Sequence, residues 1–374
     1  MKIIQFINAL GGGGAEVFAS QLSVALNRDP KNEVYLITYA GVLDDKGKML
    51  REYVIRNGVH YINIESTTKV EKLYKPVVKL NRLINQIQPD VVHSHLQPSD
   101  LYMAFLRLFN RSFKNIRTLH NPRKTKFIPK FLDNYFFSMF DHNVGCSLFV
   151  KKNYPDVDIR SQIKSIDNGI DLQEVNEEKQ KTEKSAIRNQ LNIPEDSCVF
   201  INVGSMYLTN GMFSKKNQHL IIESLALLPD NTNWFMVFVG DGPLRKDLED
   251  RCLDLGIRNR VLFTGLVKSP YRFIFAADYC LMPSSDEGLP ISLIESVCSG
   301  LPSILSSIPA FKPFDADSSQ FLESFDKKEL AQVLGYSIEN KKKYGELGEK
   351  NIHHYMNVFD IDKVASKYMD LYNK

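Results

Sequence analysis

The stretch SSDEGLPISLIESVCSG, residues 284–300, places Glu287 and Glu295 on either side of Pro290 in an otherwise apolar run. One helix through the stretch would be broken by the proline, and one strand would be too long. Because proline is favoured at the first position of a helix, we expect a helix that starts near Pro290 and follows a loop. Its buried side is marked by apolar residues at helical spacing, namely Ile291, Ile294, Val297 and Cys298. With the apolar run 279–282 before the loop, the stretch predicts the strand–loop–helix unit of α/β folds.

The same alternation of strand and helix continues outward along the chain. Six runs predict strands in the first half, namely KIIQFINAL, EVYLITYA, VHYINI, DVVHSH, IRTLHN and DHNVGCS. Five follow in the second half, namely CVFINVGS, WFMVFVGDG, RVLFTGL, YCLMPSS and PSILSS. We therefore expect an α/β protein with two doubly wound, Rossmann-like parallel-sheet domains that face a cleft. The first domain spans residues 1–168, to which a C-terminal helix at 358–374 packs back, and the second spans residues 169–357.

The composition indicates an ordinary globular protein rather than a membrane-spanning one. Of the 374 residues, 43% are hydrophobic and 24% are charged, and no apolar stretch approaches the length of a membrane span. The five cysteines are widely spaced, which favours reduced core residues and a cytoplasmic location over disulfides or metal binding. The start, MKIIQFINALGGGGAE, predicts a buried strand rather than a signal peptide, because glycines and a glutamate stand where a cleavage site would be.

The unusual residues fall at predicted strand ends, where ligands of open parallel sheets bind. The amide end of the helix near Pro290 attracts anions, phosphates above all. Glu287 would repel a phosphate unless it bound an uncharged neighbouring group, so the pattern indicates a ligand with a phosphate and a hydroxyl-rich part. Glycines 11–14 would let a phosphate or sugar approach the backbone, although ALGGGGAE fails the dinucleotide fingerprint because Glu16 replaces its last glycine. A flexible strand–helix turn is the alternative.

Two other groups of polar residues stand near predicted strand ends. Lys215 and Lys216 precede a helix of the second domain, where they would either meet a diphosphate as point charges or stay solvated. His93 and His95 end one strand of the first domain and His120 ends another. A metal site would need a third ligand and supporting carboxylates, for which His120 and Asp100 are the candidates. We expect them to be hydrogen-bonding groups in a polar cleft, and we expect no bound metal. Three Asp-x-Asp pairs, at 156/158, 315/317 and 360/362, follow no convincing buried strand.

Charge is distributed unevenly along the chain. Residues 1–170 carry 24 Lys and Arg against 15 Asp and Glu, a net +9, and the remainder is net −6, which gives +3 in total. Between residues 102 and 140 eight basic residues face one acid and are interleaved with aromatics. The plain alternative is a helix core with solvated charges. We favour an anionic membrane surface that carries a lipid-diphosphate acceptor, and we expect no nucleic-acid partner because no reading motif is present.

An ordered series of short motifs resembles glycosyltransferase family 4. The motifs are GGAE (13–16), NGID (168–171), VG (203–204), KN (216–217), VGDGP (239–243), FTG (263–265), AD (277–278) and EGLPISLIE (287–295). The resemblance covers nearly the whole chain, and the Glu-x7-Glu segment is its most specific part. It implies a retaining enzyme with the two-domain GT-B fold and a metal-independent reaction.

The resemblance also implies roles for single residues. Glu287 would bind hydroxyls of the donor sugar, Lys216 would neutralise the departing diphosphate, and His120 matches a family position near the reacting sugar. The other residues expected to bind the nucleotide sugar are Gly13, Gly14, Gly204, Ser205, Lys215, Gly265, Gly288, Leu289, Pro290, Ile291 and Glu295. The family usually has an arginine where Ser205 stands, and the insertion YLTNGMFSK (207–215) separates Ser205 from Lys216. Either Lys215 supplies the second positive charge, or the donor binds more weakly.

The function implied is transfer of a hexose from a nucleotide-diphosphate sugar to a glycan or lipid-linked acceptor in surface polysaccharide synthesis. UDP is favoured over GDP by family frequency alone. Two alternatives stay open: a nucleotide-sugar epimerase on the same double sheet, and a nucleotide-sugar-binding protein that has lost catalysis.

Overall fold

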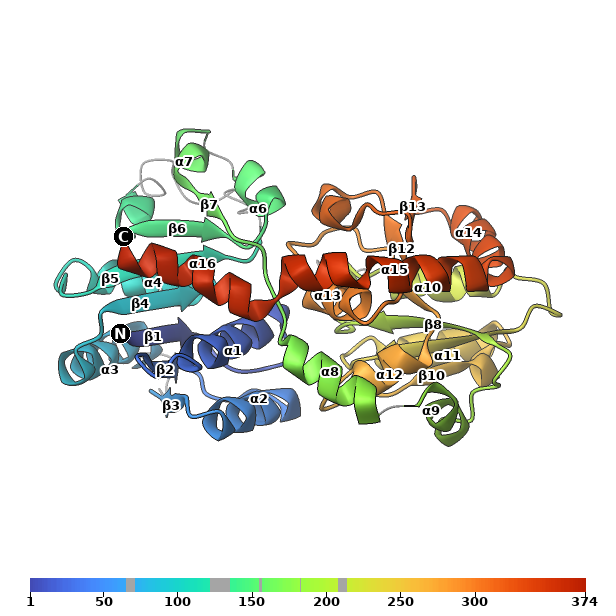
Figure 1. Cartoon of the computed structure of the whole chain (residues 1–374), viewed down its shortest axis with the longest axis horizontal. Helices are drawn as coiled ribbons and strands as arrows, with labels where there is room; N and C mark the ends of the chain where they lie inside the picture. The colour runs from blue at the N-terminus through green and yellow to red at the C-terminus, as the bar shows by residue number, and fades with distance from the viewer. Residues whose placement is uncertain (65–70, 122–134, 155–156, 182, 208–213) are drawn as a thin grey trace. The chain divides into compact units, whose positions relative to one another are not determined.

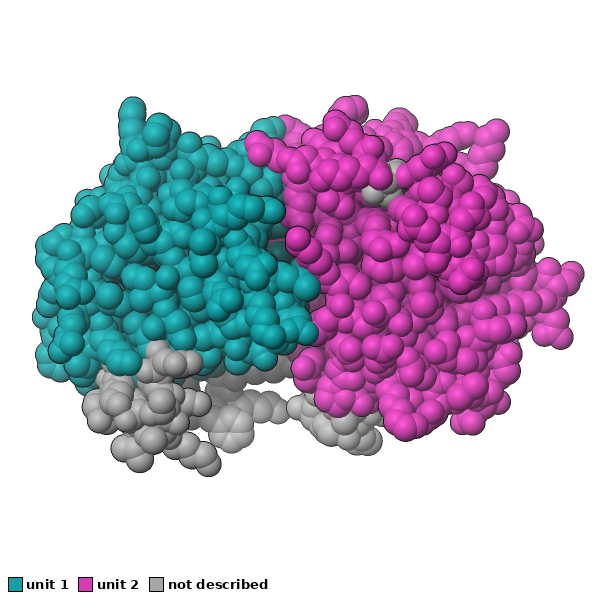
Figure 2. Space-filling view, turned by 90° about the horizontal axis from the view of Figure 1, so that it is seen from below, with its two compact units in different colours: residues 1–171, 359–374 teal, residues 172–358 magenta. Residues whose placement is uncertain are grey.

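The computed structural model describes the chain except for residues 65–70, 122–134, 155–156, 182 and 208–213. It divides into two compact units, unit 1 with residues 1–171 and 359–374 and unit 2 with residues 172–358 (Figure 2). Each unit is built on one parallel sheet, so the predicted α/β class with two parallel-sheet domains is confirmed. Among the described residues, no helix has the length and hydrophobicity that crossing a bilayer requires.

Within the described part of unit 1, the sheet has seven strands in the order β3-β2-β1-β4-β5-β6-β7 (Figure 1). They are β1 (Lys2–Ile7), β2 (Glu33–Thr38), β3 (His60–Asn63), β4 (Val91–His95), β5 (Lys114–Leu119), β6 (His142–Gly145) and β7 (Lys164–Ser165). β1 lies between β2 and β4, with Ile4 opposite Tyr35 on one side and Val92 on the other. The strand order therefore reverses at β1, as in doubly wound folds.

Helices cover both faces of this sheet. They are α1 (Gly14–Asn27), α2 (Asp45–Arg56), α3 (Glu71–Ile87), α4 (Gln97–Leu106), α6 (Leu148–Lys152), α7 (Val157–Gln162) and α16 (Ile361–Asn373). Successive β1 residues point to opposite faces, so Ile4 and Phe6 join the core under α3 and α4. Gln5 points to the other face and bonds to Tyr372 of α16. On that face α1 and α16 lie side by side (Figure 1).

The described sheet of unit 2 has six strands in the order β10-β9-β8-β11-β12-β13. They are β8 (Cys198–Val203), β9 (Trp234–Val239), β10 (Val261–Phe263), β11 (Tyr279–Met282), β12 (Ser303–Ser306) and β13 (Ser319–Leu322). The α-helices are α8 (Leu172–Lys181), α9 (Lys184–Gln190), α10 (Gln218–Leu225), α11 (Arg245–Asp254), α12 (Tyr271–Ala276), α13 (Ile291–Cys298), α14 (Lys327–Glu339) and α15 (Lys341–Phe359). Phe200 and Met236 of the central strands pack with α10, α11 and α14 in one apolar core.

Two edge strands, β7 and β13, escape the sequence prediction. β7 has only two residues, Lys164 and Ser165, which carry no apolar signal. β13 reads SQFL, and three of its four residues are only partly buried. Edge strands bury one face weakly, so the hydrophobic pattern that identifies central strands is missing from both.

The two segments of unit 1 that join it to unit 2 lie side by side. The Ile170 N–H donates to the Phe359 carbonyl (2.8 Å), and the Ile361 N–H donates to the Ile170 carbonyl (3.0 Å). Arg28, the C-cap residue of α1, holds both segments, through Asp171 at 2.7 Å and Asp362 at 2.5 Å. The C-terminal segment is thus fixed to unit 1 at its start, and the rest of α16 packs on the sheet.

A nearly buried carboxylate, Asp278, organises one end of the unit 2 sheet. It accepts hydrogen bonds from the Val199 N–H (2.8 Å), from Arg188 Nη2 (2.7 Å) and from Lys184 Nζ (2.7 Å). Arg188 is itself buried and also donates to the Ala276 carbonyl. Burial raises the pKa of Asp278, but the charges of Lys184 and Arg188 outweigh burial and lower that pKa overall. Asp278 is therefore charged at neutral pH.

We predict that Asp278→Ala destabilises unit 2 by about 3–5 kcal/mol, because it leaves the buried Arg188 guanidinium without its carboxylate. Urea unfolding followed by the fluorescence of Trp234, the single tryptophan of the chain, reports this change from the unit 2 core. Asp250→Ala is the control, since Asp250 is half exposed and pairs with the exposed Lys246. Its urea midpoint should stay close to that of the wild type. Equal midpoints for the two variants would contradict the prediction.

Candidate active site

Two loops of unit 2 are joined at the carboxyl ends of neighbouring strands. The lysine loop, residues 214–217, precedes α10, and the glutamate loop, residues 283–290, connects β11 to α13. Asn217 Nδ2 donates to the Pro283 carbonyl (2.8 Å), and the Ser285 N–H donates to the Lys215 carbonyl (2.8 Å). These bonds fix the distance between the loops, so side chains from one reach those of the other.

Two ion pairs cross between the same loops. Lys216 Nζ lies 2.6 Å from Glu287 Oε1, and Lys215 Nζ lies 2.5 Å from Asp286 Oδ2. The side chains of Lys216 and Glu287 are only 18% and 13% exposed, so water and salt screen this pair less than a surface pair. Lys215 is 38% exposed and its pair is the more solvated of the two. The structure thus brings together Glu287 and Lys216, both expected from the sequence to be catalytic.

Glycines at the strand ends make room for the lysine loop. A Cβ on Gly204, which follows β8, would lie 3.2 Å from Lys216 Cε, so the lysine stem packs directly on the glycine. A Cβ on Gly240 would lie 2.2 Å from the Gly204 carbonyl oxygen, and its φ of +134° also favours glycine. The Gly240 N–H donates to the Gly265 carbonyl (3.1 Å). Gly204, Gly240 and Gly265 therefore pack the ends of β8, β9 and β10 closely, while Ser205 lies exposed.

The predicted helix after the glutamate loop is present as α13. It begins at Ile291, with Pro290 as an extended N-cap residue that offers no side-chain hydrogen bond. The N–H groups of Leu293 and Ile294 share the Pro290 carbonyl, which leaves the first N–H groups of the helix facing forward for other acceptors. Glu295 lies in the second turn and is 8% exposed. The start of α13 suits an anion, as the sequence predicted.

The glycine loop of unit 1 lies against two carboxylates. Helix α1 has Gly13 as its N-cap residue and begins at Gly14. The Gly12 N–H donates to Asp44 Oδ2 (3.1 Å), and a Cβ on Gly13 would lie 2.1 Å from Glu16 Oε2. Burial and, to a lesser extent, the charge of Asp44 raise the pKa of Glu16. The sequence analysis missed Asp44, whose contact with the loop depends on the start of α2, outside the motif.

The histidines of unit 1 lie differently from the prediction. His93 and His95 of β4 are completely buried, so the expectation that they lie in a polar cleft is wrong for both. They point to the sheet face that α16 covers, and Tyr372 of that helix bonds to His93 Nδ1 (2.7 Å). Only His120, directly after β5, is partly exposed. Its Nε2 lies 3.1 Å from His95 Nδ1.

The other members of this histidine network come from three elements. Thr118 Oγ1 lies 2.8 Å from His93 Nε2, and Gln5 Oε1 lies 2.7 Å from His95 Nε2. Tyr368 OH lies 2.9 Å from Thr118 Oγ1. The sequence holds two signals for this network: a glutamine inside a buried strand, and two tyrosines one helical turn apart at 368 and 372.

Burial determines the charge of these histidines. It lowers the pKa of His93 to about 3 and that of His120 to about 4, and it holds the pKa of His95 well below its ordinary value. The nearby His120 ring lowers the pKa values of His93 and His95 further. All three rings are therefore neutral at pH 7, and each carries a proton on one nitrogen only.

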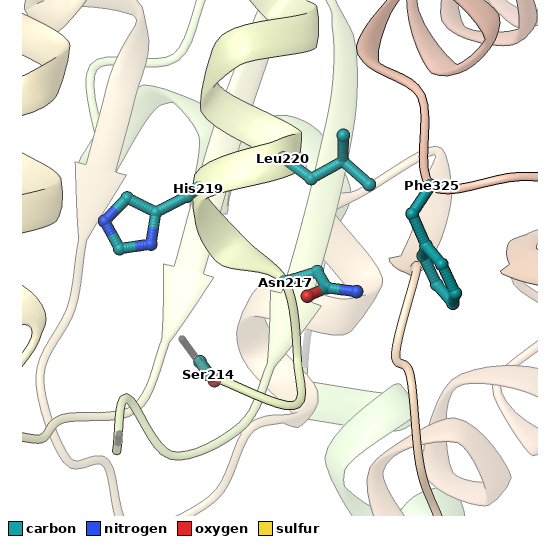
Figure 3. Close-up of a pocket in the computed structure, with 5 residues that line it drawn as sticks. All are labelled: Ser214, Asn217, His219, Leu220 and Phe325. Carbon is teal, nitrogen blue, oxygen red and sulfur yellow. The ribbon is translucent and has the colours of Figure 1, made fainter. Parts of the chain in front are cut away.

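A small pocket of about 170 Å³ opens beside the start of α10 (Figure 3). It is lined by Ser214, Asn217, His219, Leu220 and Phe325. None of the residues expected from the sequence to bind the donor lines it. His219 is held by Asp247 at 2.7 Å. The pocket therefore lies beside the lysine loop without being part of the predicted site.

Two family models together match most of the chain. The family described as Glycosyltransferase Family 4 matches residues 12–174, and the one described as Glycosyl transferases group 1 matches residues 183–354. The chain belongs to glycosyltransferase family 4. This confirms the resemblance carried by the ordered motifs, and it assigns the two parallel-sheet units to the GT-B fold.

Curated relatives of this family 4 glycosyltransferase share about a quarter of its residues. The UDP-Gal:alpha-D-GlcNAc-diphosphoundecaprenol alpha-1,3-galactosyltransferase of Escherichia coli is 24% identical over 323 residues, covering 79% of this chain and 79% of the relative. The capsular polysaccharide biosynthesis glycosyltransferase CapH of Staphylococcus aureus is 24% identical over 405 aligned positions, covering 100% of this chain and 98% of the relative. An uncharacterized glycosyltransferase of Methanocaldococcus jannaschii is 25% identical over 252 residues, and the match spans 62% of this chain but only 59% of the relative.

Among solved structures, the family 4 glycosyltransferase is similar to Alr3699/HepE of Anabaena in complex with UDP-glucose. The TM-score is 0.79 at 17% identity, over 99% of this chain and 98% of the other. At this identity the likeness supports the fold alone, and it extends over both units.

The predicted site residues of the glycosyltransferase fall into separate groups. Those of unit 2 gather at the ends of β8 and β11, namely Gly204, Ser205, Lys215, Lys216 and residues 287–291. Gly265 follows β10, two strands away from β8, and Glu295 lies inside α13. In unit 1, Gly13 and Gly14 follow β1 while His120 follows β5, with β4 between these strands. The roles expected for these residues remain predictions.

We predict that the stability of unit 1 falls as the pH drops from 7 to 5. The pKa values of His93 and His95 are lowered on folding, so below about pH 6.5 the unfolded chain binds more protons than the folded one. His93 should remove about 2 kcal/mol between pH 7 and pH 5, before most carboxylates titrate, and His95 should add to this loss. Urea unfolding of unit 1 at a series of pH values measures this loss.

The variant His93→Gln should show a shallower pH slope than the wild type. His353→Gln is the control, because His353 is exposed on α15 of unit 2, and it should keep the wild-type slope. A stability of unit 1 that stays flat from pH 7 to pH 5 would show that the buried rings do not stay neutral.

Proposed function

We propose that the protein is a retaining, metal-independent hexosyltransferase that uses a nucleotide-diphosphate sugar, with UDP as the favoured nucleotide. The acceptor is a glycan or a lipid-linked sugar in surface polysaccharide synthesis. The observation that supports this most directly is the nearly buried ion pair between Lys216 and Glu287 in front of the start of α13. It puts a cation, a carboxylate and helix N–H groups within one small region, which suits a diphosphate joined to a sugar.

The proposed chemistry follows the charge that develops during transfer. The bond between the sugar C1 and the diphosphate oxygen breaks, so negative charge grows on the diphosphate and positive charge grows on the ring. Lys216 and the first N–H groups of α13 would stabilise the leaving group, and Glu287 would hold sugar hydroxyls. The acceptor oxygen bonds to C1 and its proton passes to the departing diphosphate. Retention without a covalent intermediate is implied by the family.

A diphosphate would compete with Glu287 for Lys216. In the structure the ammonium nitrogen already lies 2.6 Å from Glu287 Oε1, so it is near the proposed site before a donor arrives. Lys215 is the second cation of the lysine loop, but it is shared with Asp286. We propose that Lys215 replaces in part the arginine that the family usually has at the position of Ser205. Gly13, Gly14 and His120 of unit 1 are proposed to contact the diphosphate and the reacting sugar.

The names of similar proteins support the donor and acceptor classes. The Anabaena structure contains UDP-glucose, and the name of the E. coli relative includes a UDP-sugar donor and a diphosphoundecaprenol-linked acceptor. The S. aureus relative is named for capsular polysaccharide biosynthesis. We propose UDP as the nucleotide on these grounds. The hexose and the linkage are to be identified by experiment.

We predict that Lys216→Ala and Glu287→Ala each lower turnover about a hundredfold, because each removes an interaction worth about 3 kcal/mol in the transition state. Turnover is measured as UDP release from a panel of UDP-sugars, with and without lipid-diphosphate-linked acceptors. Lys246→Ala is the control, since Lys246 is an exposed lysine of the same unit and pairs with Asp250. It should keep wild-type turnover and melting temperature.

The outcomes separate the candidate functions. Near-wild-type turnover in Lys216→Ala or Glu287→Ala would remove that residue from the mechanism. An epimerised nucleotide sugar without acceptor-linked product would indicate the epimerase. A thermal shift with UDP but no hydrolysis or transfer of any UDP-sugar would indicate a binding protein. An α-linked product from an α-linked donor, identified by NMR, supports retention.

We also propose that unit 1 binds peripherally to an anionic membrane surface on the cytoplasmic side. Part of the basic and aromatic run, residues 122–134, lies outside the described residues.

The described part leaves a group of apolar side chains exposed on and after α4, called here the α4 patch: Leu101, Phe105, Leu108 and Phe109. Phe109 is 74% exposed, and its ring contacts that of Phe105. Helix α3, which packs against α4, carries the exposed Lys79 and Arg82, and the exposed Arg111 follows α4 in the chain. Aromatic side chains with basic neighbours are typical of interfacial binding.

We predict that the protein sediments with phosphatidylglycerol vesicles at low salt, and that the double variant Phe105→Ser/Phe109→Ser does not. High salt should weaken binding of the wild type, because lysine and arginine attract the anionic surface. Phe325→Ser is the matched control, since Phe325 is a 50% exposed phenylalanine of unit 2. A wild type that stays in the supernatant at low salt would contradict the membrane proposal.

A further inference from the structure

The buried side chain of Gln5 sets the direction of hydrogen bonds in the histidine network. Its Nε2 donates to Tyr372 OH (3.1 Å), so its Oε1 faces His95 Nε2 at 2.7 Å. An amide oxygen only accepts, and therefore His95 Nε2 must carry the proton of this bond. Gln5 is completely buried, so no water competes for its oxygen.

The tautomer of His95 then determines that of His120. The pKa of His95 lies well below its ordinary value because of burial, so the ring holds one proton, on Nε2. Its Nδ1 is a bare lone pair, and His120 Nε2 lies 3.1 Å from it. His120 Nε2 must therefore donate, which places its single proton on Nε2 as well.

The remaining nitrogen of His120 has no hydrogen-bond partner among the described residues. Among the described residues, no side chain or backbone group is within hydrogen-bonding distance of His120 Nδ1, and the residue is partly exposed. In a neutral ring protonated on Nε2, this nitrogen can only accept a hydrogen bond. It suits a hydroxyl group, and it does not suit a phosphate oxygen, which also only accepts.

We infer that His95 is a positioning residue that holds His120 in its Nε2–H tautomer, so that Nδ1 of His120 accepts a hydrogen bond from a hydroxyl of the donor sugar. This rests on the proposed function, because it deepens the role proposed there for His120. Residues that orient metal-binding histidines typically change activity about 10–100-fold when they are replaced, and we expect an effect of the same order for His95. The chain Tyr372–Gln5–His95–His120 would thus connect the C-terminal helix to the reacting sugar.

Two amide substitutions at His95 test its bond to Gln5 and its bond to His120 one at a time. In His95→Asn the amide oxygen can occupy the place of Nδ1, so the acceptor for His120 is kept while the bond to Gln5 is lost. In His95→Gln the amide occupies the place of Nε2, so the bond to Gln5 is kept while the acceptor for His120 is lost. Both variants replace a buried ring with a smaller amide, and a similar loss in melting temperature is expected for both.

The experiment combines kinetics with a direct measurement of the tautomer in the full chain. UDP release from UDP-glucose should fall about 10–100-fold in kcat for His95→Gln with little change in KM, while His95→Asn should stay within about threefold of the wild type. Long-range ¹H–¹⁵N spectra of the histidine-labelled protein should show His120 protonated on Nε2 in the wild type and in His95→Asn. In His95→Gln this preference should be lost. His120→Gln identifies the resonances.

Either of two results would overturn the inference. One is a wild type in which His120 carries its proton on Nδ1, as would follow if the bonds ran in the opposite direction. The other is equal kcat in the two His95 variants. If the wild type releases no UDP from any UDP-sugar, the proposed function fails, and the tautomer spectra still test the inference separately.

Discussion

The ion pair between Lys216 and Glu287 is the constraint on which the proposed donor site depends. It exists because β8 and β11 are neighbours in the sheet, so the loops that leave them meet at the same edge. One backbone bond, from the Ser285 N–H to the Lys215 carbonyl, and one bond from the Asn217 side chain to the Pro283 carbonyl fix the spacing of these loops. A lysine on an untethered loop would lose much conformational entropy on binding a phosphate. Here the lysine already lies against a carboxylate, so its charge would be preorganised for the proposed leaving group.

Unit 1 uses a different kind of interaction, a buried polar layer between its sheet and α16. Each ring nitrogen of His93 and of His95 has a partner, and the partners come from β1, β5 and α16. Such networks fix one arrangement, because any shift leaves buried polar atoms unsatisfied. The network therefore explains why the C-terminal segment packs in one register on unit 1. The ion pairs of Arg28 hold the start of that segment. An apolar interface would allow α16 to shift along the sheet, and this polar layer does not.

Periodicity and turn chemistry predicted the central strands, the helix after Pro290 and the glycine-rich strand ends, because each of these depends on a few adjacent residues. What failed depends on contacts between distant residues or on weak burial. The edge strands β7 and β13 lack an apolar pattern of their own. His93 and His95 look like site residues because they end a strand, and only the packing of Tyr368 and Tyr372 from the far end of the chain buries them. The pairing of Lys215 with Asp286, and the carboxylate of Asp44 beside the glycine loop, likewise need the fold.

The residues proposed to bind the donor differ in charge between the two units. The described strand ends of unit 2 present two lysines and the start of α13, which suit the diphosphate. Around its predicted site residues unit 1 presents a neutral His120 and a Glu16 whose pKa is raised by burial, groups that suit hydroxyls better than phosphates. Glu16 lies against Gly13, so a diphosphate that approached this glycine would have to meet the carboxyl in its protonated form or displace it. Burial therefore leaves His120 neutral and suited to a hydroxyl, whereas the lysines proposed to bind the diphosphate lie in unit 2.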